Sequence, residues 1–340
     1  MGEAMQAVLT TAHGGLEVLE FRDDYPRPIP GDGEVLIRIA ACAVNFHDLF
    51  TRRGMPGVKI ALPVVVGSDI AGTVDGVGPG ASAHWLGKRV LVDPVFREGD
   101  RFGMIGETVD GGRAEFVAVH ESMLLEIPPN VTSEQAAALP LAYGTAYRML
   151  ITRGGLQRGE RLMVLGASGG VGVACVQIAR MVGAEVLAFA SSKPKLERLN
   201  ALGAAHVANY LERPFLDTVK EIYGKPRING GGGVDVAVNF SGGDTLPATQ
   251  RCVKLDGRIL CCGATAGFDL ALDARYWWTF EHRMIGSNGW EKTDLAKLLD
   301  LVASGELAPA IDSVLPLRQT AQAEALLENR QVVGKVLIKP

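Results

Sequence analysis

The sequence has few cysteines and no long apolar run, and both features limit the classes of protein to which it can belong. Its 5 cysteines show no C-x-x-C spacing, which favours reduced thiols and a cytoplasmic location. No apolar run approaches the ~20 residues that a bilayer-spanning helix needs, so we expect no membrane segment. The cysteines are Cys42, Cys175, Cys252, Cys261 and Cys262.

A surplus of basic residues is also missing. The 34 Lys and Arg residues are outnumbered by 38 Asp and Glu residues, which gives a formal net charge of -4. This balance argues against a nucleic-acid partner. With 47% apolar and 21% charged residues among 340, and no low-complexity tract, the composition is typical of a globular protein of about two domains.

What the sequence does contain is a glycine-rich turn between an apolar run and a helical pattern. The apolar run is Leu162–Leu165, the helical spacing extends to Val182, and a second apolar run, Glu185–Ala190, completes a βαβ unit. Glycines let a pyrophosphate approach the backbone, and the helix that follows presents unpaired N–H groups to it. The segment therefore predicts a dinucleotide site formed by Gly166, Ser168, Gly169, Gly170, Val171 and Gly172.

The residues after the second apolar run favour NADPH over NADH. A protein selecting NAD places a carboxylate about 20 residues past the turn, where it holds the ribose hydroxyl and repels a 2′-phosphate. This chain has no carboxylate there and offers Ser191, Lys193 and Lys195 instead, with Arg198 one helical turn beyond. Alternatively, Ser191 and Ser192 cap a helix and the lysines are solvated, which is compatible with phosphate binding.

Strand and helix patterns predict a two-domain α/β chain. Short apolar stretches separated by Gly and Pro predict a β-rich first part up to about Pro128. A helical pattern from Thr132 to Arg153, broken at Pro140, marks the boundary. Strands then alternate with helices up to Cys262, which predicts a parallel, doubly wound sheet. We expect residues 1–130 and 273–340 to form one domain and 131–272 an inserted dinucleotide-binding domain.

Several motifs together resemble the medium-chain dehydrogenase/reductase superfamily, and within it the zinc-free quinone oxidoreductase branch. The resemblance covers nearly the whole chain and implies a GroES-like catalytic domain with an inserted Rossmann domain. The motifs are Ala43 to Asp48 (AVNFHD), Gly67 to Gly72 (GSDIAG), Leu139 to Tyr147 (LPLAYGTAY), the turn from Gly166 to Gly172, Val207 to Tyr210 (VANY), and Gly334 to Val336 (GKV).

The resemblance also implies a metal-free enzyme. Zinc-dependent members carry Cys where Asn45 stands and a His-Glu pair where Ser68 and Asp69 stand, and an amide or a hydroxyl is a poor zinc ligand. The cysteines of the superfamily's structural zinc site are missing from Asp93 to Gly112. Without a Lewis acid, the expected acceptor is a small hydrophobic electrophile, a quinone or an α,β-unsaturated carbonyl.

Asn45 and His47 are the candidate catalytic residues, on a loop that the resemblance places near the nicotinamide. The Asn45 amide can hold the acceptor's oxygen and the His47 imidazole can deliver a proton. Alternatively, Asn45 fixes the loop through hydrogen bonds and His47 is a packing residue. Phe50 replaces a Tyr found in many quinone oxidoreductases, and Asp48 is expected to pair with a nearby arginine, Arg52 or Arg53.

Further cofactor contacts follow from the resemblance alone. It places Thr145 beside the nicotinamide, Tyr210, Lys195 and Arg330 at the 2′-phosphate end, and the loops with Gly263, Ala264 and Asn288 around the nicotinamide. Homodimerisation is a further expectation, through an edge within Arg258 to Leu272. Trp277, Trp278 and Trp290 either line the substrate cleft or serve packing or a subunit contact.

Two alternatives to the quinone or enone reductase remain open. One is a zinc-free alcohol or aldehyde oxidoreductase in which His47 belongs to a proton relay. The other is a protein that binds NADPH without turnover, as a structural or redox-sensing component.

Overall fold

The computed structural model describes residues 3–55, 59–98 and 101–340. The chain divides into two compact units, Met1–Leu141 with Leu295–Pro340, and Ala142–Asp294. The expected organisation differed at both ends of the insertion, since it placed 131–141 in the second domain and 273–294 in the first. The second difference has a clear cause, because β16 (Arg283–Gly286) pairs with β15 (Val253–Cys261) and extends the sheet of the second unit.

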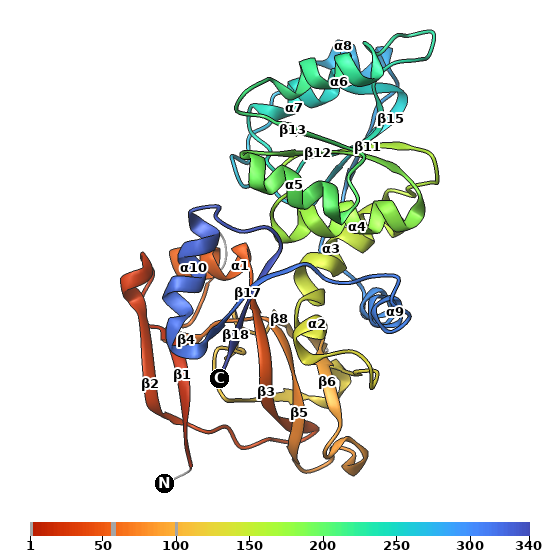
Figure 1. Cartoon of the computed structure of the whole chain (residues 1–340). Coiled ribbons are helices and arrows are strands. Elements are labelled where there is room, and N and C mark those ends of the chain that lie inside the picture. Colours follow the sequence, from red (N-terminus) through yellow and green to blue (C-terminus); the bar gives the residue numbers. More distant parts are fainter. Residues whose placement is uncertain (1–2, 56–58, 99–100) are drawn as a thin grey trace. The chain divides into compact units, whose positions relative to one another are not determined.

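The first unit is built on β-sheets (Figure 1). Its 7-stranded sheet has the order β10-β6-β5-β3-β18-β17, with β9 also paired to β3, and a 3-stranded sheet has the order β2-β1-β4. The strands are β1 (Ala4–Thr10), β2 (Leu19–Pro26), β3 (Glu34–Val44), β4 (Val64–Val65), β5 (Asp69–Val77), β6 (Arg89–Val92), β7 (Val95–Glu98), β8 (Arg101–Met104), β9 (Phe116–His120), β10 (Leu124–Glu126), β17 (Ile311–Pro316) and β18 (Lys335–Lys339).

The core of this unit follows the two-residue period of its strands. Val35, Ile37 and Ile39 alternate along β3 and are nearly or fully buried, and they pack with Ile70 and Val74 of β5. The carboxyl end of β3 is fixed on two sides, because Ala43 pairs with Asp69 of β5 and Val44 pairs with Val336 of β18. That end leads directly into the candidate catalytic residues.

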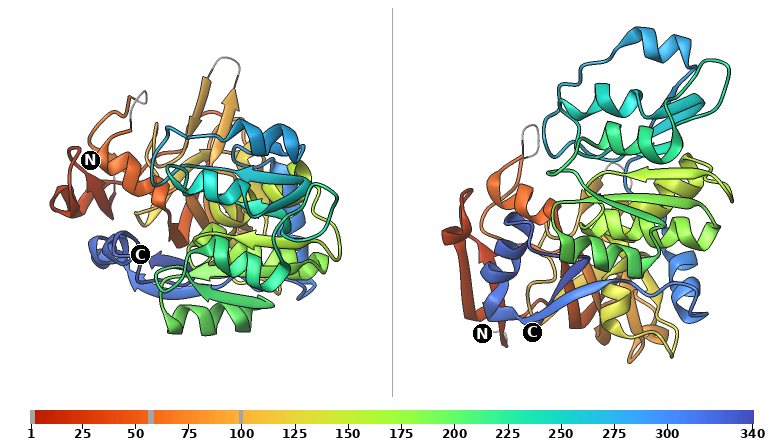
Figure 2. Two further views of the ribbon diagram at one scale, coloured as in Figure 1. Left: turned by 90° about the horizontal axis from the view of Figure 1, so that it is seen from above. Right: turned by 45° about the horizontal axis from the view of Figure 1, so that its top comes forward.

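The helices that accompany the first unit include two that pack together. Helix α1 (Phe46–Arg53) and α10 (Thr320–Glu328) lie side by side, although they are far apart in the sequence (Figure 2). We expected residues 45–47 to form a loop, and the structure corrects this, because α1 begins at Phe46. Asn45 is its N-cap, and the backbone N–H of Asn45 donates to Asp48 Oδ2 at 2.8 Å, half of a capping box.

The second unit is a doubly wound parallel sheet, as predicted. Its 6 strands have the order β13-β12-β11-β14-β15-β16, and every pairing is parallel. Helices cover both faces in Figure 1, with α4 and α5 on one and α6 and α7 on the other. The remaining strands are β11 (Arg161–Val164), β12 (Glu185–Ala190), β13 (His206–Asn209) and β14 (Val234–Val238); the helices are α4 (Gly170–Val182), α5 (Lys193–Leu202), α6 (Phe215–Tyr223), α7 (Thr245–Gln250) and α8 (Ala274–Thr279).

The α-helix ends shortly before Pro140, close to the expected break. After α2 (Ser133–Ala137), the chain continues through wide π-type turns at Leu139–Gly144 and Arg148–Arg153, separated by α3 (Thr145–Tyr147). Proline lacks the N–H that closes an ordinary helical turn, so the wider turns carry the helix past it. Helix α9 spans Lys292–Ala303. Within the described residues, no helix combines the length and the apolar character that a bilayer crossing requires.

Candidate active site

The glycine-rich turn joins β11 to α4 and leaves open space beside Gly169. Gly166 has a φ of +67°, a conformation that favours glycine. A Cβ at Gly172 would lie 2.6 Å from backbone atoms of Ala167, so a glycine at this position lets the helix approach the turn. A Cβ at Gly169, in contrast, would meet its nearest atom only at 3.9 Å. The 13-residue helix α4 then presents its N-terminus to this space, as a pyrophosphate site requires.

Most of the other predicted cofactor residues lie at the same edge of the sheet. Because the strands are parallel, their carboxyl ends meet there. Ser191 follows β12, Tyr210 follows β13, and Asn288 lies shortly after β16; Gly263 and Ala264 follow β15. The structure therefore brings these residues to the edge that carries the glycine-rich turn, where Ser168, Gly170 and Val171 also lie.

Thr145 and Arg330 are placed differently. Thr145 is the first residue of α3 and is only 7% exposed. Arg330 follows α10 in the first unit and has a φ of +53°. The predicted contacts of these two residues with a cofactor stay predictions.

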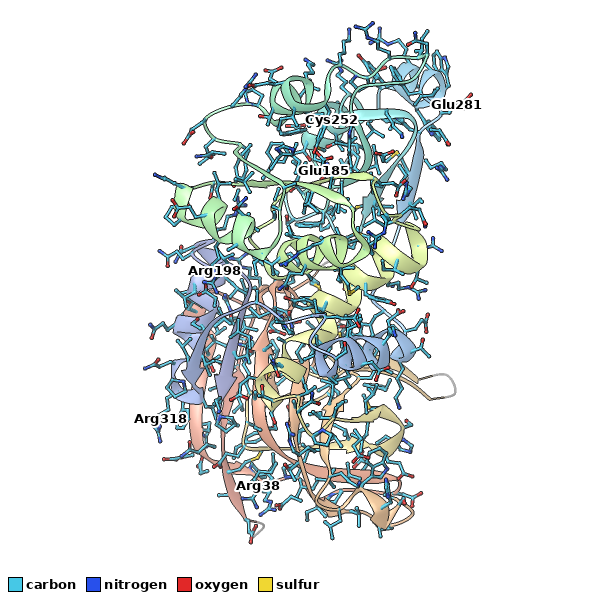
Figure 3. The ribbon with its side chains drawn as sticks, turned by 45° about the vertical axis from the view of Figure 1, so that its right-hand side comes forward. Arg38, Glu185, Arg198, Cys252, Glu281 and Arg318 are labelled. Carbon is cyan, nitrogen blue, oxygen red and sulfur yellow. The ribbon has the colours of Figure 1, made fainter. Side chains whose placement is uncertain are left out.

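The segment after β12 carries the residues that the sequence assigns to a 2′-phosphate. Ser192 is the N-cap of α5, but its side chain makes no capping bond, so the alternative role in capping is not observed for it. Lys193 is highly exposed, and its Nζ lies 4.0 Å from Glu197 Oε1 in a solvated pair that is worth little. Lys195 is half-buried and Arg198 projects from α5 one turn later (Figure 3).

In the first unit, Asn45 is committed to buried neighbours. It is 4% exposed, its Nδ2 donates to Asp69 Oδ2 at 2.9 Å, and its Oδ1 accepts from Lys335 Nζ. Lys335 Nζ also lies 3.3 Å from Asp69 Oδ2 and donates to the carbonyl of Val44 at 3.2 Å. This geometry matches the alternative in which Asn45 fixes the loop, since both ends of its amide are engaged.

Asp69 and Lys335 form a buried ion pair that sequence reasoning missed. Asp69 is fully buried and Lys335 is 2% exposed. Burial raises the pKa of Asp69, while Lys335, Asn45 and the backbone N–H of Leu141, 3.0 Å from Oδ1, act in the opposite direction. A lysine in the motif Gly334 to Val336 was the available signal, but its partner lies 266 residues away in the sequence.

A zinc ion does not fit these residues. The amide of Asn45 and the carboxylate of Asp69 both face the ammonium of Lys335, which already supplies a positive charge. Ser68 Oγ is buried and has no hydrogen-bond partner in the part of the chain that the structure describes. Across residues 3–55, 59–98 and 101–340, no three His, Cys, Asp or Glu side chains are grouped to hold a metal ion.

His47 lies in the first turn of α1 and pairs with a residue that sequence reasoning did not identify. Its Nε2 hydrogen-bonds to Glu107 Oε2, and the two side chains are 28% and 14% exposed. Burial disfavours the charged imidazole, but Glu107, with smaller contributions from Asp48 and Asp69, raises the pKa of His47 above its ordinary value. The pair is a partly exposed acid–base group in the catalytic half of the chain.

Asp48 pairs with Arg113 instead of the expected Arg52 or Arg53. Its Oδ2 accepts from Arg113 Nη2 at 2.9 Å, and Arg113 also binds Glu324 of α10. Glu324 accepts from Arg52 Nε at 2.6 Å, so two arginines hold the pKa of its buried carboxyl below the usual range despite desolvation. These buried ion pairs connect α10 to Asp48, which lies in the first turn of α1, the helix whose N-cap is Asn45.

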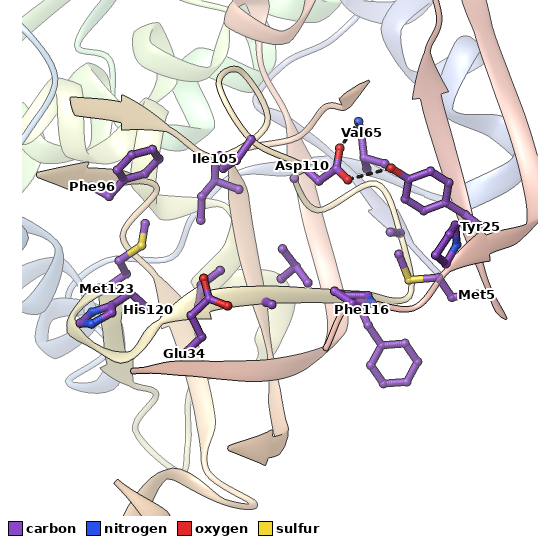
Figure 4. Close-up of a pocket in the computed structure, with 18 of the residues that line it drawn as sticks. Met5, Tyr25, Glu34, Val65, Phe96, Ile105, Asp110, Phe116, His120 and Met123 are labelled. Carbon is purple, nitrogen blue, oxygen red and sulfur yellow. Dashed lines mark hydrogen bonds between the residues drawn. The ribbon is translucent and has the colours of Figure 1, made fainter. Parts of the chain in front are cut away.

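One cavity of the first unit does not contain the candidate catalytic residues (Figure 4). It measures about 340 Å³ and is bounded by β9, the start of β3 and the segment 105–111. Asp110 Oδ2 accepts from the Tyr25 hydroxyl at 2.8 Å, and burial together with Asp110 raises the pKa of Tyr25 to about 12.

Comparison with known proteins places this architecture in a family. One family model, the alcohol dehydrogenase GroES-like domain, matches residues 31–129, and another, the zinc-binding dehydrogenase, matches residues 170–304. Human quinone oxidoreductase is 31% identical and aligns over 98% of this chain and 97% of its own length. The chain belongs to the medium-chain dehydrogenase/reductase superfamily. Within that superfamily it is quinone oxidoreductase-like, with a GroES-like domain and a Rossmann domain.

Solved structures agree with this assignment of the chain to the medium-chain dehydrogenases/reductases. An NAD-dependent alcohol dehydrogenase is 35% identical and superimposes with a TM-score of 0.91, covering 99% of this chain and 100% of its own. A mycobacterial protein in complex with NADPH is 28% identical, with a TM-score of 0.82 and coverage of 99% and 100%. The fold is therefore that of a nicotinamide-dinucleotide-binding oxidoreductase.

Proposed function

We propose that this medium-chain dehydrogenase/reductase is an NADPH-dependent enzyme that transfers hydride, without zinc, to a quinone or an α,β-unsaturated carbonyl. The observation that supports zinc independence is that the ammonium of Lys335 contacts both Asp69 and Asn45. An acceptor with a conjugated carbonyl suits such a site, because hydride adds at carbon while hydrogen bonds and a proton stabilise the distant oxygen. The similarity to quinone oxidoreductases supports the same acceptor class.

The second unit fits the cofactor that this function needs. The space beside Gly169 and the N-terminus of α4 suit a pyrophosphate, and Ser191, Lys193 and Lys195 suit a 2′-phosphate. When bound, the dihydronicotinamide supplies the hydride. The chain's own residues bind and orient it, and they provide the proton in the first unit.

Steady-state kinetics with metal analysis test the proposal. The purified protein is assayed with NADPH and with NADH against a panel of quinones and enones, before and after treatment with a chelator. We expect kcat/KM at least about tenfold higher with NADPH, since each charge-assisted phosphate contact is worth about 1.5–3 kcal/mol. Activity that disappears on chelation and returns with zinc would reject the proposal.

A zinc-free alcohol or aldehyde oxidoreductase is the second candidate, because an NAD-dependent alcohol dehydrogenase is among the similar structures. The same assay separates the two candidates. Oxidation of simple alcohols with NAD, without turnover of any quinone or enone, would select the second. Tight NADPH binding without turnover of either substrate class would instead select a non-catalytic binding protein.

We also propose that the protein is a cytoplasmic homodimer that pairs through the second unit. The expected edge within residues 258–272 is corrected, because β15 is internal and β16 is the edge strand. Several exposed apolar side chains lie in β16 or shortly before it in the sequence. They are Phe268, Leu270, Leu272, Trp277, Trp278 and Met284. Trp290, in contrast, is buried. Light scattering that gives the mass of one chain would reject the dimer.

A further inference from the structure

The His47–Glu107 pair is held in place from both sides. His47 belongs to the first turn of α1, whose N-cap Asn45 is fixed by Asp69 and Lys335. Glu107 belongs to a tight turn, in which its backbone N–H donates to the carbonyl of Met104 at 3.2 Å. The backbone that carries the imidazole and the backbone that carries the carboxylate are therefore both held in place.

Glycines fix the position of the turn that carries Glu107. Gly106 has a φ of +76°, and a Cβ there would lie 2.6 Å from the backbone nitrogen of Gly67. Gly111 is equally confined, because its Cβ would lie 2.4 Å from the carbonyl oxygen of Gly67. Gly67 immediately precedes Ser68 and Asp69 in the sequence. The turn thus packs directly on the segment that leads into the buried Asp69.

Among the carboxylates around His47, Glu107 differs in its pairing. Three carboxylates raise the pKa of the imidazole, and they are Glu107 from the turn, Asp48 from its own helix and Asp69 from β5. Asp48 is paired with Arg113 at 2.9 Å and Asp69 with Lys335 at 3.3 Å. In the described part of the chain, no lysine or arginine pairs with Glu107, so no salt bridge with a lysine or arginine competes with its pairing to His47.

The second ring nitrogen of His47 is available to a substrate. Its Nε2 is occupied by Glu107, whereas Nδ1 has no hydrogen bond to any described residue. The side chain is 28% exposed, so a ligand can approach it. An imidazolium in this arrangement has one N–H held by the carboxylate and one N–H to give.

We propose that His47 donates the proton that completes the reduction and that Glu107 is the positioning residue that keeps His47 protonated for this step. The inference rests on the proposed function. Addition of hydride to the acceptor leaves an electron pair on its oxygen, as an enolate or a hydroquinone anion. The Nδ1–H bond of His47 breaks, its electrons remain on nitrogen, and the proton forms the O–H bond. Solvent then returns a proton to the neutral imidazole, and Glu107 stays ionised throughout.

The first test needs no cofactor and no substrate. The imidazole of His47 is titrated by NMR in the wild type and in Glu107→Gln, which keeps the shape of the side chain and removes its charge. We expect the pKa of His47 to fall by about one to three pH units. Glu185→Gln is the matched control, because Glu185 (Figure 3) pairs with His206 in the other unit, and removing its charge should leave the titration of His47 unchanged. An unchanged titration in Glu107→Gln would overturn the role of Glu107.

The second test follows kcat against pH with a quinone acceptor. We expect the wild-type rate to fall as pH rises through the pKa of His47, and the fall to begin at lower pH in Glu107→Gln. His47→Gln should lose this limb and lower kcat by about 10²–10⁴-fold, whereas His206→Gln should behave like the wild type. A normal limb in His47→Gln would overturn its role as donor. If the wild type reduces no quinone or enone, the proposed function fails, while the NMR titration still decides whether Glu107 holds the proton on His47.

Discussion

Replacing Lys335 by Met should cost the protein about 3–5 kcal/mol of unfolding free energy, because it removes one partner of a buried ion pair. The ammonium lies 3.3 Å from Asp69 Oδ2, and both side chains are almost completely buried. At this distance and an effective dielectric constant of about 20, the attraction between two unit charges is about 5 kcal/mol. After the substitution, the donors that Asp69 keeps among the described residues are the Asn45 amide and the Leu141 N–H.

A double-mutant cycle isolates the pairing from the general cost of substitution. Asp69→Asn is expected to cost less than Lys335→Met, because the ammonium retains Asn45 Oδ1 and the Val44 carbonyl. The double variant Asp69→Asn/Lys335→Met buries no unpaired charge. Its loss of unfolding free energy should therefore be about 2–3 kcal/mol smaller than the sum of the losses in the two single variants. Urea unfolding followed by circular dichroism measures all four proteins. Costs that add to within about 0.5 kcal/mol would refute the coupling.

Three further predictions concern the cofactor turn, the 2′-phosphate site and the His47–Glu107 pair. Gly172→Ala pushes a Cβ against the Ala167 backbone at 2.6 Å and should weaken NADPH binding at least about tenfold in a calorimetric titration; unchanged affinity would contradict the role of the turn. Ser191→Asp places a negative charge beside the proposed 2′-phosphate site, so the ratio of kcat/KM with NADPH to kcat/KM with NADH should fall. An unchanged ratio would mean that the 2′-phosphate binds elsewhere. The pKa of His47 is higher in the folded protein than in the unfolded chain, where it is near 6.5. The pair therefore stabilises the folded protein at pH values below 6.5, and this contribution is lost as the pH rises through the pKa of the folded state. Glu107→Gln should therefore lower the unfolding free energy more at pH 6 than at pH 9, and an equal loss at both would count against the pairing.

Elements with a clear pattern could be predicted from the sequence to the residue. The strand Glu185–Ala190 has the predicted bounds, because burial of a whole strand imposes an apolar run. The strand Arg283–Gly286 was missed, since it is an edge strand with mostly exposed residues and no such pattern.

The candidate site was predictable only where its chemistry is local. The glycine-rich turn and its order with the strand and helix are contiguous, so the cofactor edge followed from the sequence. The helix at Phe46–Arg53 was missed, although Asn45 and Asp48 carry the spacing of a capping pair. The partners of Asn45, His47 and Asp48 lie 290, 60 and 65 residues away, and tertiary packing alone decides such pairings.

The most direct test of the account uses NADPH deuterated at the reactive C4 position and protein whose metal content has been measured. Metal-free protein is mixed with an enone, and the product is analysed by mass spectrometry and NMR. We predict one deuterium on the carbon β to the carbonyl, at the same rate with and without added zinc. Product formation that requires stoichiometric zinc, or product without deuterium from the cofactor, would contradict it.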